Sequence, residues 1–146
     1  MAVSIKMYSH FPLTLLTDKM GDFSGETTLK CALATSSYTP SQDDHDYFDD
    51  ITNEVSGTGY SAGGAIITTT NPSVTGRVTT FDAADIAWSD STITARYAII
   101  YDYTGGTAGT NALVAYIDFG EDKSSESGTF QLTLNASGLF TITVAA

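Results

Sequence analysis

Apolar and polar residues alternate along most of the chain from residue 27 onward, which is typical of strands with one buried face. Three runs show the alternation most clearly: residues 27–35, 92–103 and 112–119. We expect one face of each run to hold Leu29, Cys31 and Leu33 in the first, Ile93, Ala95, Tyr97, Ile99 and Tyr101 in the second, and Leu113, Ala115, Ile117 and Phe119 in the third.

Shorter apolar runs predict further strands at residues 51–55, at 65–70, on either side of Asp82 to Asp85, and at 129–135 and 139–144. The last two runs are separated by "ASG", which favours a hairpin with Phe130, Leu132 and Leu134 facing inward. Polar and glycine-containing runs predict loops and turns at 36–50, 57–64, 71–76, 104–111 and 120–128. About eight or nine strands at this spacing predict an all-β, single-domain β-sandwich or barrel.

The amino-terminal stretch has a different pattern. Residues 9–20 are the best candidate for a short helix, because Pro12 is tolerated in a first helical turn. We divide the chain into an amino-terminal segment, 1–22, and a β-sandwich domain, 23–146. The segment either packs as a cover on the sandwich or serves as an attachment arm, in which case its apolar side chains contact a partner. Those side chains are Tyr8, Phe11, Leu13, Leu15 and Leu16.

The chain is strongly acidic. It has 146 residues with 17 Asp and Glu against six Lys and Arg, a formal net charge of −11. This charge argues against nucleic acid as a partner, which requires clustered Lys and Arg, and against an anionic membrane surface. A partner attracted electrostatically should present a basic patch. We find no signal peptide pattern and no apolar run of membrane-spanning length.

The most acidic stretch is "DDHDYFDD", residues 43–50. It lacks the glycine and terminal Glu of an EF-hand loop, so only an irregular Ca²⁺ site stays open. Zinc would need more nitrogen and sulfur ligands than His45, His10 and Cys31 supply. We therefore interpret the stretch as a solvated loop, with Tyr47 and Phe48 packed beneath it or against a neighbouring subunit, and expect no metal and no cofactor.

Signatures of catalysis are absent from the sequence. There is no G-x-S-x-G elbow, and paired aspartates cleave glycosides only when one carboxyl has a raised pKa in a sugar-binding cleft. Cys31, in an apolar run, is interpreted as a buried inert thiol. Trp88 fits core packing better than a sugar-stacking platform. We expect Arg96 to pair with a carboxylate, within the subunit or across an interface, because its guanidinium matches a carboxylate in two-point fashion.

The stretches "TSSYTPSQDDHDYFDDITNEVSGTGYSAGGA", "STITARYAIIYDYTGG" and "ALVAYIDFGEDKSSESGTFQLTLNASGLFTITVA", after "IKMYSHF", resemble a family of small structural proteins of tailed bacteriophages. The resemblance implies a non-enzymatic virion protein that decorates or cements the capsid by binding the major capsid protein or neighbouring virion proteins. It also implies a homo-oligomer, assembled in the bacterial host cytoplasm.

Three alternatives stay open at this point. The protein could occupy a tail or fibre position in the virion. It could be a carbohydrate-binding β-sandwich that uses Trp88 or exposed tyrosines. It could be a hydrolase acting through the aspartates of residues 43–50.

Overall fold

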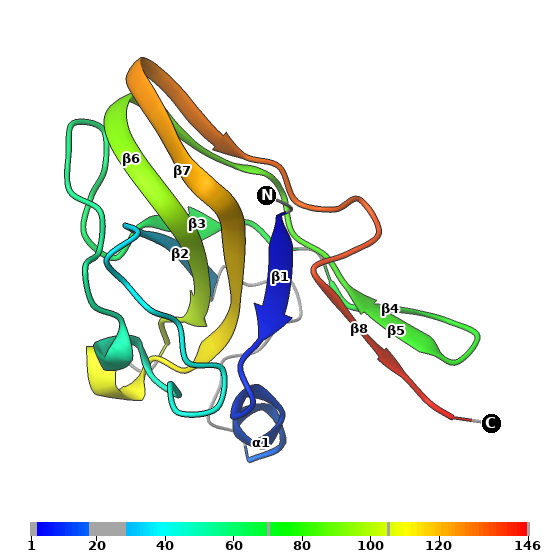
Figure 1. Ribbon diagram of the computed structural model, residues 1–146. Helices are drawn as coiled ribbons and strands as arrows, with labels where there is room; N and C mark the ends of the chain where they lie inside the picture. Colours follow the sequence, from blue (N-terminus) through cyan, green and yellow to red (C-terminus); the bar gives the residue numbers. More distant parts are fainter. Residues whose placement is uncertain (1–2, 18–28, 70, 105, 146) are drawn as a thin grey trace.

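The computed structural model describes residues 3–17, 29–69, 71–104 and 106–145, which form a sandwich-like all-β fold with one short helix (Figure 1). In chain order the elements are β1 (Ser4–Met7), α1 (Phe11–Leu16), β2 (Leu29–Ala34), the 3₁₀ turn η1 (Phe48–Asp50), β3 (Ala65–Ile67), β4 (Ser73–Thr75), β5 (Val78–Phe81), β6 (Ile86–Asp102), the 3₁₀ turn η2 (Ala108–Thr110), β7 (Leu113–Leu132) and β8 (Phe140–Thr143). One antiparallel sheet has the order β1-β7-β6-β2-β3 and the other the order β4-β5-β8. The predicted all-β class and the short helix within residues 9–20 are confirmed.

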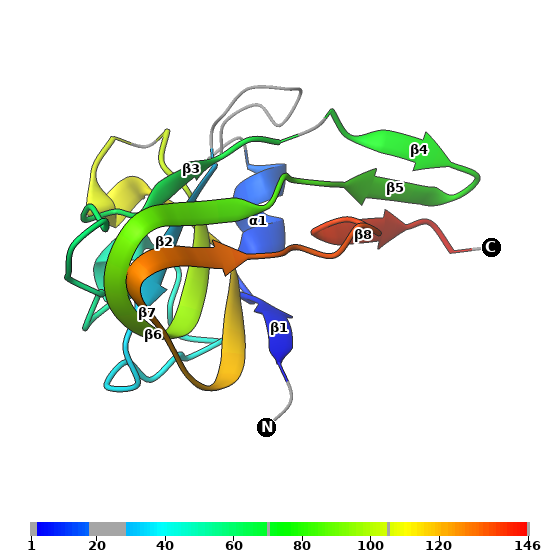
Figure 2. The ribbon, with the colours of Figure 1, turned by 90° about the horizontal axis from the view of Figure 1, so that it is seen from above.

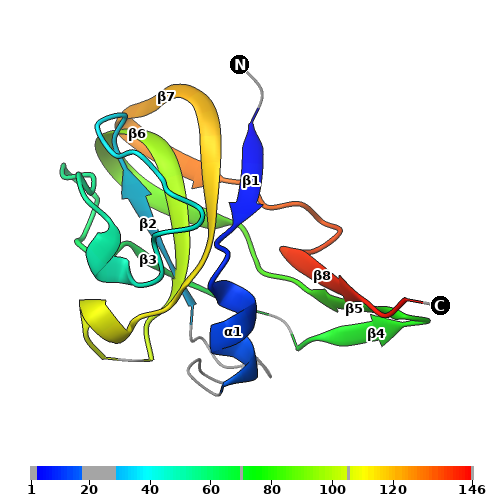
Figure 3. The same cartoon turned by 60° about the horizontal axis from the view of Figure 1, so that its bottom comes forward.

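Strands β6 and β7 form a long antiparallel ribbon on which the rest of the fold is built. They have 17 and 20 residues and pair from Ile86↔Leu132 at one end to Tyr101↔Leu113 at the other. The ribbon curves strongly along its length (Figures 1 and 3). Its register breaks between Ala95 and Tyr97, and extra residues in one strand of a pair increase bend and twist. The two halves of the ribbon therefore contribute to opposite sides of one core.

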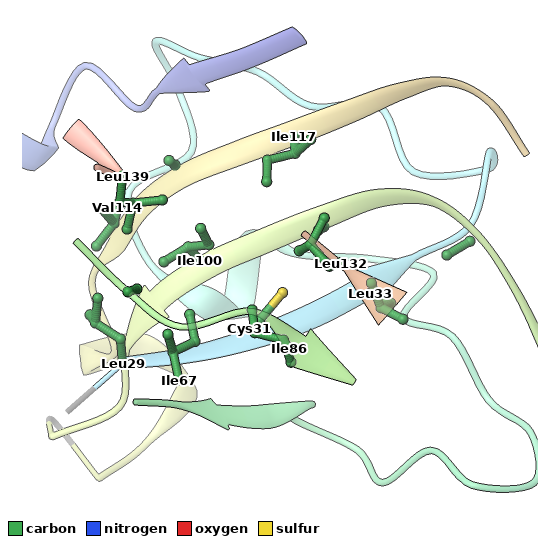
Figure 4. Packing of buried hydrophobic residues seen from close by; sticks show 14 of the residues in the cluster. Leu29, Cys31, Leu33, Ile67, Ile86, Ile100, Val114, Ile117, Leu132 and Leu139 are labelled. Atoms are coloured by element: carbon green, nitrogen blue, oxygen red, sulfur yellow. The ribbon is translucent and has the colours of Figure 1, made fainter. Parts of the chain in front are cut away.

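The main core lies on the concave side of the curved β6–β7 ribbon. Side chains from β2, β3, β6 and β7 converge there, together with Leu139 before β8 (Figure 4). Several of them are fully buried: Leu29, Cys31, Leu33, Ile67, Ile100 and Val114. Burying one such aliphatic side chain stabilises a fold by about 1.5–3 kcal/mol, so this cluster is the main source of stability.

A second cluster covers the opposite face of β2, β6 and β7. It is rich in tyrosine and consists of Tyr8, Ala32, Ala34, Tyr38, Ile99, Tyr101, Leu113 and Tyr116, with Phe48, Ile51, Tyr97 and Tyr103 packed against it. Burial on both faces explains why β2 is apolar at nearly every position, as strands covered on both sides are. The acidic loop that contains η1 supplies part of this cover.

Four of the predicted elements are wrong in detail. Residues 120–128 are not a turn but part of β7, and the hairpin expected across 136–138 does not form. Instead the end of β7 pairs with β6, and β8 pairs with β5, about 60 residues away. The turn expected at 71–76 contains β4. The strand expected at 51–55 is reduced to a single bridge between Glu54 and Ala34.

The expected strand faces are correct only up to each register break. Ile93 and Ala95 belong to the main core, whereas Tyr97, Ile99 and Tyr101 belong to the tyrosine-rich cluster. In the third run, Leu113 belongs to that second cluster and Ala115, Ile117 and Phe119 to the main core. An extra residue moves the following side chains to the other face, because side chains alternate with a period of two.

The amino-terminal residues that the structure describes are built into the fold. β1 pairs with β7 over Ser4↔Asp118 to Met7↔Ala115, and Phe11 of α1 is buried in the main core. The boundary expected between residues 22 and 23 lies outside the described residues.

Candidate interaction surface

The small sheet β4-β5-β8 projects from the body of the molecule and ends near the carboxyl terminus (Figures 1 and 2). Its strand register assigns side chains to two different faces. Val74, Thr79 and Ile142 are neighbours in one row, and Phe81 and Phe140 follow on the same face. The opposite face carries mostly hydroxyl side chains: Ser73, Thr75, Val78, Thr80, Thr141 and Thr143. The projecting sheet is therefore amphipathic, although both of its faces reach solvent.

The apolar face of this sheet is anchored in the main core. The Phe140 ring packs edge-on against Phe11, with centroids 5.1 Å apart, and its centroid lies 5.1 Å from that of Phe81. Towards the tip the apolar side chains become exposed: Val74 is 69% exposed, Ile142 50% and Val144 65%. The base of this apolar face is therefore part of the main core, whereas its tip is exposed to solvent.

Helix α1 lies beside this face and leaves a groove. The groove has a volume of about 430 Å³ and is lined by Met7, Phe11, Pro12, Leu15, Leu16, Phe140, Thr141 and Ile142. A smaller hollow of about 140 Å³ adjoins it through Leu15, Phe140 and Ile142. Leu16, which lines the groove, is 84% exposed, and Leu13 is exposed elsewhere on the same helix. We call the groove, together with the exposed Leu16, Val74, Ile142 and Val144, the apolar arm surface.

The segments that form the apolar arm surface contain no acidic residue. All 17 Asp and Glu lie outside residues 1–17, 71–81 and 127–145. The only Lys or Arg in these segments are Lys6 and Arg77. Depletion of charged residues is the compositional mark of the buried part of a protein interface. An apolar surface whose described segments carry no acidic residue, on a chain of net charge −11, is therefore a candidate binding surface.

The amino-terminal residues predicted to contact a partner divide into two groups. Tyr8 is fully buried and Phe11 nearly so, although Phe11 still lines the floor of the groove. Leu15 and Leu16 line the groove, and Leu13 is exposed on the same helix. The two groups differ because they lie on different faces of the helix. Phe11 and Thr14 face inward, whereas Pro12 and Leu13 face solvent.

Tyr47 and Phe48, also predicted to contact a partner, lie half-buried within the acidic loop. The Phe48 ring stacks on Tyr101, with centroids 4.1 Å apart, and Tyr47 lies against His10. The Asp50 carboxylate accepts hydrogen bonds from the backbone N–H groups of Asp46 and Tyr47. Burial raises the pKa of Asp50, but these donors outweigh it and the net pKa is lowered. Residues 43–50, interpreted as a solvated loop, are therefore held by hydrogen bonds within the loop and by ring contacts to Tyr101 and His10.

Arg96 pairs with a carboxylate of the same chain. Its Nε lies 2.7 Å from Oδ1 of Asp118, across the β6–β7 ribbon. The guanidinium lowers the pKa of Asp118, and a backbone N–H from Gly120 acts in the same direction. The expected pairing is confirmed, and it occurs within the subunit.

The residues that the structure describes were searched for metal-ligand clusters and reactive groups. They contain no group of three or more His, Cys, Asp or Glu gathered as metal ligands. Burial raises the pKa of the Cys31 thiol to about 12, so the thiolate that would act as a nucleophile is scarce at neutral pH. Trp88 is buried between Tyr60 and Phe130, as core packing predicts. In the same residues, no helix is both long and apolar enough to cross a lipid bilayer.

The sequence reasoning missed Val74, Ile142 and Val144. Each was placed in a turn or a hairpin, and their common face appears only when β4, β5 and β8 are paired. One feature of the sequence could have indicated this surface: Asp and Glu are absent from residues 1–17, 71–81 and 127–145 of an otherwise acidic chain.

Comparisons with known protein families, with characterised proteins and with solved structures find no match to this chain.

Proposed function

We propose that this chain is a non-enzymatic structural protein of a tailed-bacteriophage virion, and that it decorates the capsid by binding the major capsid protein. The observation that carries the proposal is the division of its surface into an acidic part and an acid-free apolar arm surface. Such a division suits a protein that works by contact with other proteins. The resemblance of residues 35–65, 91–106 and 112–145 to virion proteins supplies the biological setting.

The acidic part of the surface fits a basic patch on a capsid shell. Asp43, Asp44 and Asp49 are exposed on the acidic loop, while Asp50 and the stacked Phe48 hold the backbone of the loop in place. A fixed loop presents its carboxylates without losing much conformational entropy on binding. Complementary charge of this kind raises the rate of association and selects the partner.

The experiment starts from virions of the phage that encodes the chain. Mass spectrometry of purified particles should find it in a copy number comparable to that of the major capsid protein. Absence from the particles would overturn the proposal, and a few copies per particle would indicate a tail or fibre position instead.

A second experiment tests the acidic surface. Purified protein is added to particles from a phage that lacks the gene, and binding is measured at rising salt concentration. We expect binding to weaken with salt, and the triple variant Asp43→Asn, Asp44→Asn, Asp49→Asn to bind less well than wild type. A variant with Asp82→Asn and Asp90→Asn, outside the loop, is the control. If the triple variant binds as the control does, the acidic loop is not the capsid-binding surface.

The carbohydrate-binding alternative has less support from the structure. Trp88, its main candidate residue, is buried and has no free ring face for a sugar. A glycan array with and without Ca²⁺ tests it directly, and reproducible binding to one glycan class would favour it over the virion proposal.

A further inference from the structure

We propose that the apolar arm surface is a self-association surface, on which the projecting β4-β5-β8 sheet of one copy packs into the groove beside α1 of a second copy. The inference concerns the chain by itself and does not depend on the proposed capsid partner. It commits to a second copy of this chain as the occupant of the groove.

Charge is the first reason for this choice. A basic partner is attracted by the acidic surface, and it gains nothing from segments without Asp or Glu. Two copies, each with net charge −11, repel wherever their acidic surfaces meet. The apolar arm surface is built from described residues within the segments 3–17, 71–81 and 127–145, and none of these segments places a carboxylate in a contact between two copies.

Shape is the second reason, because each copy carries both halves of the contact. The tip of the sheet presents Val74 and Val144, which are more than half exposed, and the base presents an apolar groove between α1 and β8. Ile142 belongs to both, since it lies on the sheet and lines the groove. A surface that contains a projection and a hollow side by side can be self-complementary, as a symmetric interface requires.

The open edges of the small sheet are the third reason. Among the described residues, β8 pairs only with β5 and β4 only with β5, so each has an edge free of strand partners. The edges carry no charged residue of the kind that usually protects a strand edge from pairing, apart from Arg77 in the β4–β5 turn. A second copy seated on this face can cover the side chains and reach an open edge.

The test measures the mass of the full-length chain in solution by light scattering or sedimentation, over a range of concentrations. Wild type should contain two or more copies. Ile142→Glu should weaken association at least about tenfold, because it places a carboxylate in the centre of an apolar contact. Val144→Glu should weaken association as well; Val144 lies one residue beyond β8, and its backbone N–H bond to the Arg77 carbonyl does not involve the side chain that is changed.

Ile66→Glu is the matched control. Ile66 lies on β3, at the far edge of the other sheet, and is 52% exposed, against 50% for Ile142. It should leave the mass unchanged. Melting temperatures and circular dichroism of all variants show whether each still folds, and Val144→Glu keeps the test valid if Ile142→Glu does not.

The proposal is overturned if wild type is a monomer throughout the concentration range, or if Ile142→Glu and Val144→Glu associate as strongly as Ile66→Glu. These results are separate from those that test the virion proposal. A monomer that binds capsids would overturn only self-association, whereas an oligomer missing from virions would overturn only the capsid proposal.

Discussion

The Arg96 guanidinium and the Asp118 carboxylate meet at the β6–β7 register break between Ala95 and Tyr97, with Nε 2.7 Å from Oδ1. The same Oδ1 accepts a hydrogen bond from the backbone N–H of Gly120, at 2.8 Å. Gly120 has φ of +79°, a left-handed conformation that glycine adopts without the steric cost other residues incur. One carboxylate thus holds both strands where the ribbon bends.

We expect Asp118→Asn to lower the melting temperature at pH 7 by about 2–8 °C, the shift that a modest loss of stability produces in a domain of this size. Arg96 lowers the pKa of Asp118 in the folded state, so the folded chain favours the carboxylate. The contribution is present above the unfolded pKa of about 3.9 and is lost as pH falls through the lower folded pKa. Melting curves from pH 7 to pH 3 should show the two proteins converging in acid.

Glu121→Gln provides the control for this prediction. Glu121 pairs with Lys123 close to the same bend, but both side chains are largely exposed, and exposed ion pairs contribute little. Its melting temperature should stay close to that of wild type. An equal loss in both variants would mean that general surface charge, and not the contact at the bend, stabilises the ribbon.

Gly64→Ala should be strongly destabilising. Gly64 has φ of +73°, and a Cβ built there would overlap the backbone carbonyl of Cys31 in β2. Gly76 in the β4–β5 turn has φ of +61° with open space around its Cβ position. Gly76→Ala therefore bears only the backbone cost of about 1–2 kcal/mol. Urea denaturation should show a clearly larger loss for Gly64→Ala, and equal losses would contradict the close packing of this loop on β2.

Cys31 should be unreactive in the folded protein. Its side chain is fully buried in β2, and burial raises the pKa of its thiol to about 12. Iodoacetamide at pH 8 should leave the native protein unmodified and add one group per chain after unfolding in guanidinium, as mass spectrometry can show. Rapid modification of the native protein would mean that β2 opens readily.

The hydroxyl groups of Tyr8 and Tyr38 should show non-additive effects. Tyr8 Oη lies 3.2 Å from Tyr38 Oη, which in turn lies 2.8 Å from Nδ1 of His45. Tyr38→Phe leaves the fully buried Tyr8 hydroxyl without this partner, which costs about 1–3 kcal/mol. Adding Tyr8→Phe removes the hydroxyl that Tyr38→Phe leaves unpaired, so the double variant should be more stable than Tyr38→Phe alone. Urea denaturation of the four proteins measures the coupling, and simple additivity would contradict it.

The sequence was informative wherever a strand has a local signature. The alternation in residues 27–35 and 92–103 predicted β2 and much of β6, and Pro12 indicated the start of α1. The expected core position of Trp88 and the buried thiol of Cys31 followed from their apolar neighbours. These features depend on residues close together in the chain.

The features that could not be predicted depend on distant pairing. Residues 120–128 look like a turn because both of their faces reach solvent, and only the pairing with β6 makes them a strand. The hairpin expected at 129–144 does not form because β8 pairs with β5 and not with the end of β7, which precedes it in the sequence. The apolar arm surface was missed for the same reason, since α1, β4 and β8 come from separate parts of the chain. The register break at Arg96 could not be predicted either, because the hydrophobic pattern of the sequence does not mark it.

The pairing of β1 with β7 sets the order in which this protein can be assembled. During synthesis β1 leaves the ribosome before β7, because its partner residues, Ala115 to Asp118, follow more than 100 positions later. β2 likewise waits for the second half of β6, and β5 waits for β8 near the carboxyl terminus. The nascent chain therefore exposes the apolar residues of β1 and β2 until their partner strands have been made. Such distant contacts make folding slow relative to helical domains of similar size, and the unfinished chain is the state in which aggregation competes with folding.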